Sequence, residues 1–149
     1  MSLPTVTREE VREQIAADLE EVLVNVEAVY AYQKSNFEQL SPIVRVLGDG
    51  ALLAAQSLES YSLTYFFVLQ VWVVRYNVAS GWTEEKAEQL LDEVNATILA
   101  YIADDPTDKP WGDMSMTDRS TVNAGGNEQS GEFFLVEDFP IKVEIWATD

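Results

Sequence analysis

Hydrophobic positions near the start of the chain recur first every three to four residues and then every second residue. In residues 7–23, TREEVREQIAADLEEVL, the apolar positions at helical spacing are Val11, Ile15, Leu19, Val22 and Leu23. Thr7 and Glu10 have the spacing of a capping box, which predicts a helix that begins just after Thr7. Apolar and polar residues then alternate over residues 24–33, which predicts a strand with one buried face.

The middle of the chain contains a run that is apolar on both faces. A short strand is predicted at residues 42–48, PIVRVLG, and Gly48-Asp49-Gly50 is expected to end it. Residues 51–60 fit neither period and leave a helical turn and a loop both open. Residues 61–76, YSLTYFFVLQVWVVRY, are predicted to form the central strand. A strand with one wet face alternates, but the even positions of this one are nearly all apolar, so both of its faces need cover.

A second helix and a closing strand are predicted in the last half of the chain. Thr83 is the expected N-cap of a helix whose apolar stripe is formed by Ala87, Leu90, Leu91, Val94, Ile98 and Ile102. Residues 104–131 are expected to form a long polar loop, in which 116–123 are a candidate strand and 124–131 a turn. In the closing segment 132–149, alternation predicts a strand with one buried face, and Pro140 predicts an edge or a bulge.

Together these elements predict one α+β domain over residues 1–149. Two helices are expected to pack on one face of a mostly antiparallel sheet of four to five strands. If the helices cover the odd positions of the central strand, its even positions need another cover. The 104–131 segment and a second subunit both remain open as that cover.

Charge and composition narrow the function classes. The chain has 26 acidic and nine basic residues and a net charge of -17, and its basic residues form no cluster. This excludes nucleic-acid binding through a cationic patch that contacts phosphates. Histidine and cysteine are absent, so disulfides and thiolate metal sites are excluded and an enzyme is disfavoured. The longest apolar run, Leu63 to Val74, is too short to span a membrane, and a soluble protein made in the cytoplasm is expected.

Two kinds of residue were considered as sites. The acidic residues that could bind a cation are Asp104, Asp105, Asp108, Asp113 and Asp118, but they match no calcium-loop spacing, and no metal or cofactor is predicted. Large aromatic residues with a polar end are favoured at protein interfaces. The residues predicted to form such an interface are Phe66, Trp72 and Tyr76 on the even face, Trp111 in the polar segment and Trp146 in the last strand.

The order of elements and several strings resemble the tail terminator (tail completion) proteins of long-tailed bacteriophages. The matching strings are YAYQ after the first helix, YFFVLQVWVVRY, AEQLLDEVNATILAYIADDP with the tryptophan and glycine that follow it, and FFLVEDFPIKVEIWA. This resemblance implies a non-enzymatic virion tail protein that forms a ring, commonly a hexamer. Such a ring caps the tail tube, ends its polymerisation and joins tail to head, and its partners are further copies of itself and the tube and neck proteins. DNA passes through the ring without specific binding, and no membrane is involved.

Two alternatives remain beside that reading. A small binding module or assembly chaperone could use the apolar sheet face as a groove for a partner. An enzyme could operate on carboxylates alone, with the segment from Asp104 to Asp118 as its site. A stable monomer would favour the first alternative, and folding that depends on a divalent ion would favour the second.

Overall fold

The structure is a computed structural model that describes residues 6–35, 37, 40–55, 57, 60–75, 81–104, 108–127 and 132–148. The elements in chain order are α1 (Arg8–Val22), β1 (Ala28–Tyr30), β2 (Ile43–Ala55), β3 (Ser60–Val74), α2 (Glu84–Ala103), β4 (Asp113–Met116), β5 (Thr121–Asn127) and β6 (Glu132–Thr148). The predicted α+β class is confirmed. The sheet has six strands in the described part of the chain, one more than the upper limit of the prediction.

Both helices begin at their predicted caps. The Thr7 side chain accepts a hydrogen bond from the Glu10 amide at 3.1 Å, and the Thr83 side chain accepts one from the Lys86 amide at 3.3 Å. Each hydroxyl satisfies one of the amides that a helix start leaves without an intrahelical partner. Neither helix of the described chain is long and apolar enough to cross a membrane.

The sheet is built around the long strand β3. Its order is β1-β2-β3-β6-β4, and β5 also pairs with β6. β1 and β2 are parallel, whereas all other pairs are antiparallel. β4 and β5 pair with residues 141–144 and 132–138 of β6, one after the other along the edge that β3 leaves free.

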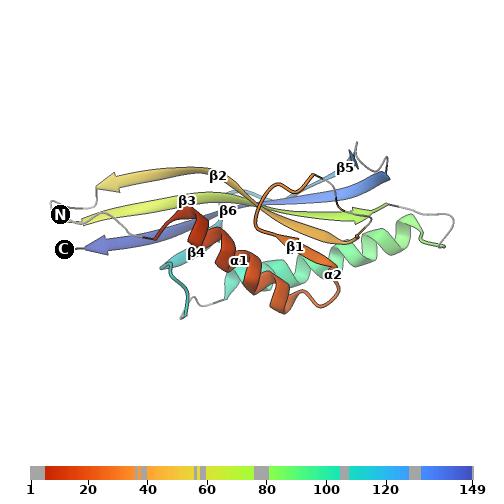
Figure 1. The fold of residues 1–149 in the computed structure, drawn as a ribbon, viewed down its shortest axis with the longest axis horizontal. Coiled ribbons are helices and arrows are strands. Elements are labelled where there is room, and N and C mark those ends of the chain that lie inside the picture. Colours follow the sequence, from red (N-terminus) through yellow and green to blue (C-terminus); the bar gives the residue numbers. More distant parts are fainter. Residues whose placement is uncertain are drawn as a thin grey trace.

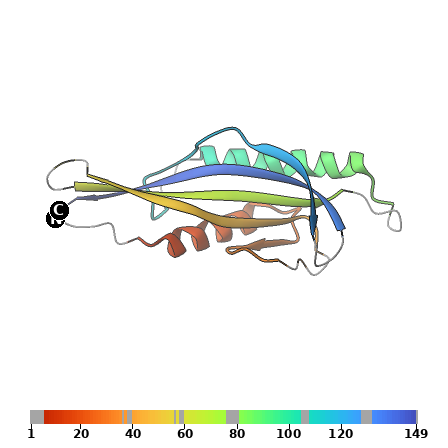
Figure 2. The ribbon, with the colours of Figure 1, turned by 90° about the horizontal axis from the view of Figure 1, so that it is seen from above.

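The two helices cover the same face of the sheet (Figure 1). Figure 2 looks onto the other face, with α1 and α2 behind the strands. On the helix side lie the odd positions of β3, of which Phe67, Leu69, Val71 and Val73 are buried. They pack with the apolar stripes of both helices in one continuous core. The helices therefore cover the odd positions of β3, and its even positions lie on the other face.

The segment 104–131, predicted to be a long polar loop, forms two strands over much of its described length. β4 and β5 extend the sheet at its edge, and the end of β5 also reaches the even face, where a Cβ at Gly125 would lie 3.6 Å from Trp72 Cζ3. Edge strands are often polar because solvent reaches them on several sides. Their sequences therefore lack the alternation of apolar and polar residues that identifies a half-buried strand. Residues 128–131 of the predicted turn lie outside the described residues.

Three other boundaries differ from the predictions. β2 continues through Gly48-Asp49-Gly50 to Ala55, and the glycines form an irregularity in its pairing with β3 instead of ending it. The residues 51–55 that fitted neither period are therefore strand. The strand predicted over residues 24–33 is reduced to Ala28–Tyr30.

Pro140 lies inside β6, opposite Val68 of β3. On the other edge of β6, β4 ends at Met116 and β5 begins at Thr121, and the Thr117 amide between them donates to the Pro140 carbonyl at 3.0 Å. The nitrogen and oxygen of one antiparallel strand residue face the same edge, so the proline nitrogen faces this interruption. The prediction of an edge is therefore correct locally, since neither β4 nor β5 pairs with Pro140, and the pairing of β6 with β3 shows no bulge there.

Candidate assembly surface

No described helix covers the face of β3 that carries its even positions. Phe66, Val68 and Trp72 are half-buried there, and so are the polar residues Thr64 and Gln70. Across the strand pairs, Phe66 lies opposite Lys142 and Val68 opposite Pro140. Of the aromatic residues that the sequence predicted as contacts, this open face holds Phe66 and Trp72; the structure does not describe Tyr76 and describes only the backbone of Trp146.

Trp72 packs against aromatic residues of its own chain. Its ring lies 5.0 Å from the Phe37 ring and 5.3 Å from the Phe134 ring, measured between centroids, and both contacts are edge-to-face. Phe37 and Phe134 are buried, and together with Ile43 and Val136 they form a second, smaller core. Phe37 precedes β2 and is a cover that the sequence analysis did not consider, whereas Gly125 of β5, which also reaches the Trp72 ring, belongs to the 104–131 segment that was considered. Trp72 therefore acts first as a packing residue within the subunit.

A polar network crosses three strands beside this aromatic cluster. Arg45 of β2, only 7% exposed, donates from Nε to Gln70 Oε1 at 3.0 Å, and Gln70 Nε2 donates to Asp138 Oδ1 of β6 at 2.8 Å. Arg45 Nη1 also donates to the Lys34 carbonyl at 2.9 Å. Burial lowers the pKa of Arg45 below its usual value, while the Asp138 carboxylate acts in the opposite direction. Gln70 is a polar residue among the mostly apolar even positions of β3, and it connects the buried Arg45 cation to the Asp138 carboxylate.

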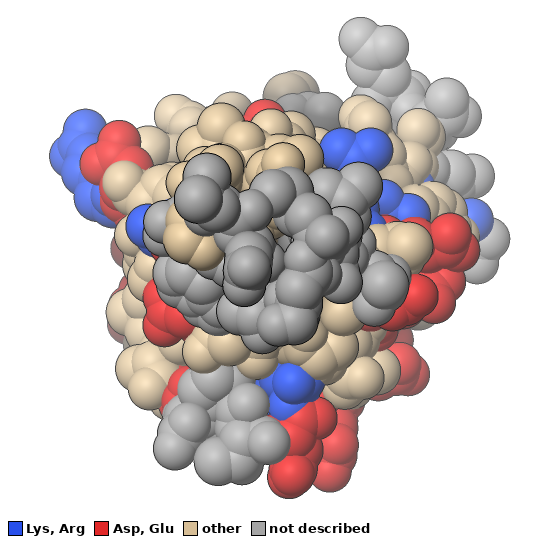
Figure 3. All heavy atoms as spheres, turned by 90° about the vertical axis from the view of Figure 1, so that its left-hand side faces the viewer, with Lys and Arg blue, Asp and Glu red and all other residues tan. Residues whose placement is uncertain are grey.

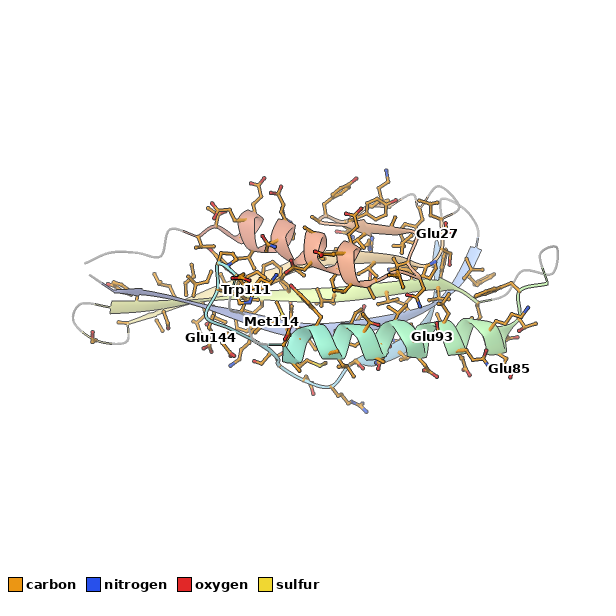
Figure 4. All side chains as sticks on the ribbon, turned by 90° about the horizontal axis from the view of Figure 1, so that it is seen from below. Glu27, Glu85, Glu93, Trp111, Met114 and Glu144 are labelled. Atoms are coloured by element: carbon orange, nitrogen blue, oxygen red, sulfur yellow. The ribbon has the colours of Figure 1, made fainter. Side chains whose placement is uncertain are left out.

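Trp111 lies in the main core and not on a surface, which contradicts its predicted place in a contact. It is 5% exposed and lies between α1 and the end of α2 (Figure 4). The segment that carries it is fixed by the Lys109 ammonium, which lies 2.9 Å from Asp18 Oδ2 of α1. Trp111 therefore joins helix to helix inside one chain.

Asp18 holds this corner of the molecule together. Besides Lys109, it accepts hydrogen bonds from the Tyr101 hydroxyl at 2.7 Å and from Gln14 Nε2 at 2.8 Å. Burial, together with the hydrogen bond to Asp18 and its negative charge, raises the pKa of Tyr101 above its usual value. Through Tyr101 and Lys109, Asp18 connects α1 to α2 and to the segment that follows α2, so this network holds the subunit together. The pKa of Tyr101 is raised and not lowered, so its hydroxyl is not an activated nucleophile.

A three-stranded extension projects from one end of the sheet, and we call it the arm: residues 51–55 of β2, 60–64 of β3 and 144–148 of β6. These strand ends run past the start of α1 (Figure 1). Leu52 and Leu53 are 57% and 50% exposed, and because strand side chains alternate, they lie on opposite faces. In the view onto this end, the described charged side chains lie mostly toward the rim (Figure 3).

Glu144 is the one charged residue of the arm, because two long stretches of the chain lack charge. No Asp, Glu, Lys or Arg occurs in residues 50–58 or 60–74, although charged residues make up 23% of the chain. The sequence analysis missed this surface because residues 51–60 fitted neither period. The lack of charge was the signal that would have found it.

The described residues do not bring metal-ligating side chains together. No group of three or more Asp, Glu, His or Cys in the described chain is close enough to hold a metal ion, and this includes the acids Asp104, Asp108, Asp113 and Asp118. Asp105 lies outside the described residues. Comparison with models of known protein families gave no match, and neither did comparison with curated proteins. The arm and the open sheet face are therefore the candidate functional surfaces of the described chain.

Proposed function

We propose that this chain is a structural virion protein of the tail terminator kind. In this proposal, copies of the chain form a ring, a hexamer by the resemblance, that caps the phage tail tube, ends its polymerisation and joins the tail to the head. The observation that carries the proposal is the arm, with Leu52 and Leu53 half exposed or more at the end of the sheet. The arm thus exposes one leucine on each of its faces, and we propose that this uncovered apolar surface is buried by contact with another protein.

The charge distribution supports self-association through the arm. A net charge of -17 makes two copies repel each other wherever their acidic surfaces face. This repulsion is screened beyond a Debye length of about 8–10 Å at moderate salt. The only charged residue of the arm, Glu144, is paired with Lys142 at 3.4 Å, so a second copy approaches the arm at low electrostatic cost, and association should strengthen as salt rises.

The position of the arm favours a ring over a closed pair. The arm occupies one end of an elongated sheet (Figure 2). If it contacts a different surface on the next copy, the contact is head-to-tail, and such contacts close into rings when the rotation between copies permits. Phe66, half-buried on the open face, remains a predicted contact residue. Tyr76 and Trp146 also remain predictions.

An acidic ring suits the passage of DNA. Scattered basic residues and a large negative charge give phosphate groups no cationic patch to bind. DNA in the channel would therefore slide without adhering. The tube and neck proteins are the proposed partners at the two ends of the ring, and no step of this function requires catalysis.

Electron microscopy of the purified protein, with light scattering at low and high salt, tests the proposal. We expect closed rings with a central channel and a mass that is a fixed multiple of the subunit mass, and both should be enriched at high salt. A monomer at every salt and protein concentration would remove the support for self-association. It would favour the small binding module, which uses the same open sheet face for a different partner.

A further inference from the structure

A pocket of about 390 Å³ lies between α2 and the edge of the sheet that β5 forms. α2 contributes Glu88, Leu91, Asp92 and Asn95 to its lining, and the strands contribute Val122, Leu135 and Glu137. The pocket lies on the helix side of the sheet, away from the open face proposed for assembly. Its lining combines three carboxylates with an aliphatic wall, and no basic residue contributes to it.

Glu137 is a buried carboxylate that lacks a cationic partner. It is 4% exposed, and its Oε2 accepts hydrogen bonds from Asn95 Nδ2 at 2.8 Å and from Ser120 Oγ at 2.7 Å. In the described part of the chain, its Oε1 accepts no hydrogen bond and neither oxygen has an ion pair. Burying a carboxylate without a countercharge is costly. A ligand that supplies a positive charge at Oε1 would therefore be bound by a group that is already positioned.

The lining indicates an organic cation and not a metal ion. The carboxylates of Glu88, Asp92 and Glu137 do not converge, since the described residues contain no group of three that could hold a metal. Instead, Leu91, Leu135 and the half-exposed Val122 offer apolar surface beside the buried charge. An alkyl chain that ends in a cation satisfies both features, because its stem buries apolar area while its head reaches the carboxylate.

We infer that this pocket binds an arginine or lysine side chain carried by an extended segment of a partner protein. β5 borders the pocket, and in the described chain its only strand partner is β6. Its outer edge can therefore accept a further strand, which supplies main-chain hydrogen bonds while one basic side chain enters the pocket. A guanidinium group fits best, because it donates two parallel hydrogen bonds to a carboxylate.

The first test uses n-butylguanidinium as a probe of the pocket alone. It is titrated at constant ionic strength into ¹⁵N-labelled protein, and the side-chain amide of Asn95 reports binding by NMR. We expect a saturable shift that n-butanol does not cause, and an affinity at least about 10-fold weaker in Glu137→Gln, the loss of one charge-assisted contact. Asp49→Asn is the matched control, because it removes the same charge from an exposed site elsewhere.

Equal binding to Glu137→Gln and to wild-type protein would overturn the assignment of Glu137. Equal weakening in Asp49→Asn would show general attraction to an acidic protein and would overturn the pocket. Urea denaturation of each variant establishes that it is folded before binding is compared. The titration measures binding to the pocket in whichever oligomeric state the protein adopts. A negative result would therefore overturn the pocket assignment without bearing on the ring proposal.

The second test distinguishes a protein segment from a free amine. A blocked pentapeptide of β-branched residues with a central arginine is compared with n-butylguanidinium and with the same peptide carrying norleucine. We expect the arginine peptide to bind at least about 10-fold more tightly than either and to shift the backbone amides of β5. If it binds no more tightly than n-butylguanidinium, or shifts other strands, docking along β5 is overturned.

Discussion

The guanidinium carbon of Arg45 lies 5.2 Å from the centroid of the Trp72 ring, across neighbouring strands on the sheet face without helices. The same guanidinium lies 5.7 Å from the Phe37 ring. A cation in contact with two aromatic rings stabilises the packing of both. The central strand thus has two kinds of cover: the helices protect its odd positions, and the chain itself protects the Trp72 end of its even positions. Only the arm end is left for another molecule.

Trp72→Ala should lower the free energy of unfolding by about 3 kcal/mol, because it empties the space between Phe37, Phe134 and Arg45. Urea denaturation measures this loss. Trp72→Phe keeps an aromatic ring but removes the bond from Nε1 to Gln70 Oε1, which is 2.6 Å long, so its loss should be smaller. A Trp72→Phe variant as stable as wild-type protein but unable to associate would show that Trp72 is a direct contact residue.

Stability should fall at high pH through Tyr101. Its pKa is raised in the folded protein above the 10.0 of an exposed tyrosine, chiefly by burial and then by Asp18. The stabilisation from the neutral hydroxyl is therefore complete below pH 10.0 and is lost as the pH rises further, because the unfolded chain ionises first. The slope due to this residue is at most about 1.4 kcal/mol per pH unit.

Tyr101→Phe isolates this effect. Urea denaturation of both proteins from neutral pH to about pH 11 gives the difference in free energy, in which the titration of the other residues cancels to first order. The variant should be less stable at neutral pH by about 1 kcal/mol, because Asp18 loses a donor. The difference should shrink above pH 10.0. A constant difference over the whole range would contradict the assignment.

The two glycines before the arm should respond differently to alanine. Gly50 has a φ of 104°, a conformation that side chains disfavour, so Gly50→Ala should cost about 1–2 kcal/mol. A Cβ at Gly48 would lie 3.5 Å from Arg8 Cδ, which is an ordinary van der Waals contact. Gly48→Ala should therefore change stability by less than about 0.5 kcal/mol. Thermal unfolding of both variants checks the contrast, and equal losses would contradict it.

Local patterns in the sequence predicted the parts of the fold that have a single buried stripe. The caps at Thr7 and Thr83 and the buried odd positions of β3 follow directly from local spacing. β5 was predicted only in part: residues 121–123 of the candidate strand 116–123 belong to it, but residues 124–127 were expected to be a turn. The pair Gly125-Gly126 indicated a turn, but Gly125 is in the strand, where a Cβ would lie 3.0 Å from Val136 Cγ2 and 3.6 Å from Trp72 Cζ3. Its small size serves a tertiary contact, which local sequence does not reveal.

The candidate site was harder to predict than the fold. Aromatic type alone suggested Trp72 and Trp111 as contacts, yet Trp111 is in the core and Trp72 packs on Phe37, which is far from it in the sequence. The leucines of the arm are exposed because β2 extends past the start of α1. The sequence did not predict this extension, because Gly48 and Gly50 were expected to end the strand. Exposure is a property of the assembled sheet and not of a residue type.

The most direct test of the account is the solution mass of Leu53→Glu beside that of Leu99→Glu, measured by light scattering at high salt. Both leucines are exposed, one on the arm and one on α2, so both variants add the same charge to a surface position. The account predicts that wild-type protein and Leu99→Glu form the ring and that Leu53→Glu stays monomeric while remaining folded. A ring of unchanged mass and stability in Leu53→Glu would contradict assembly through the arm.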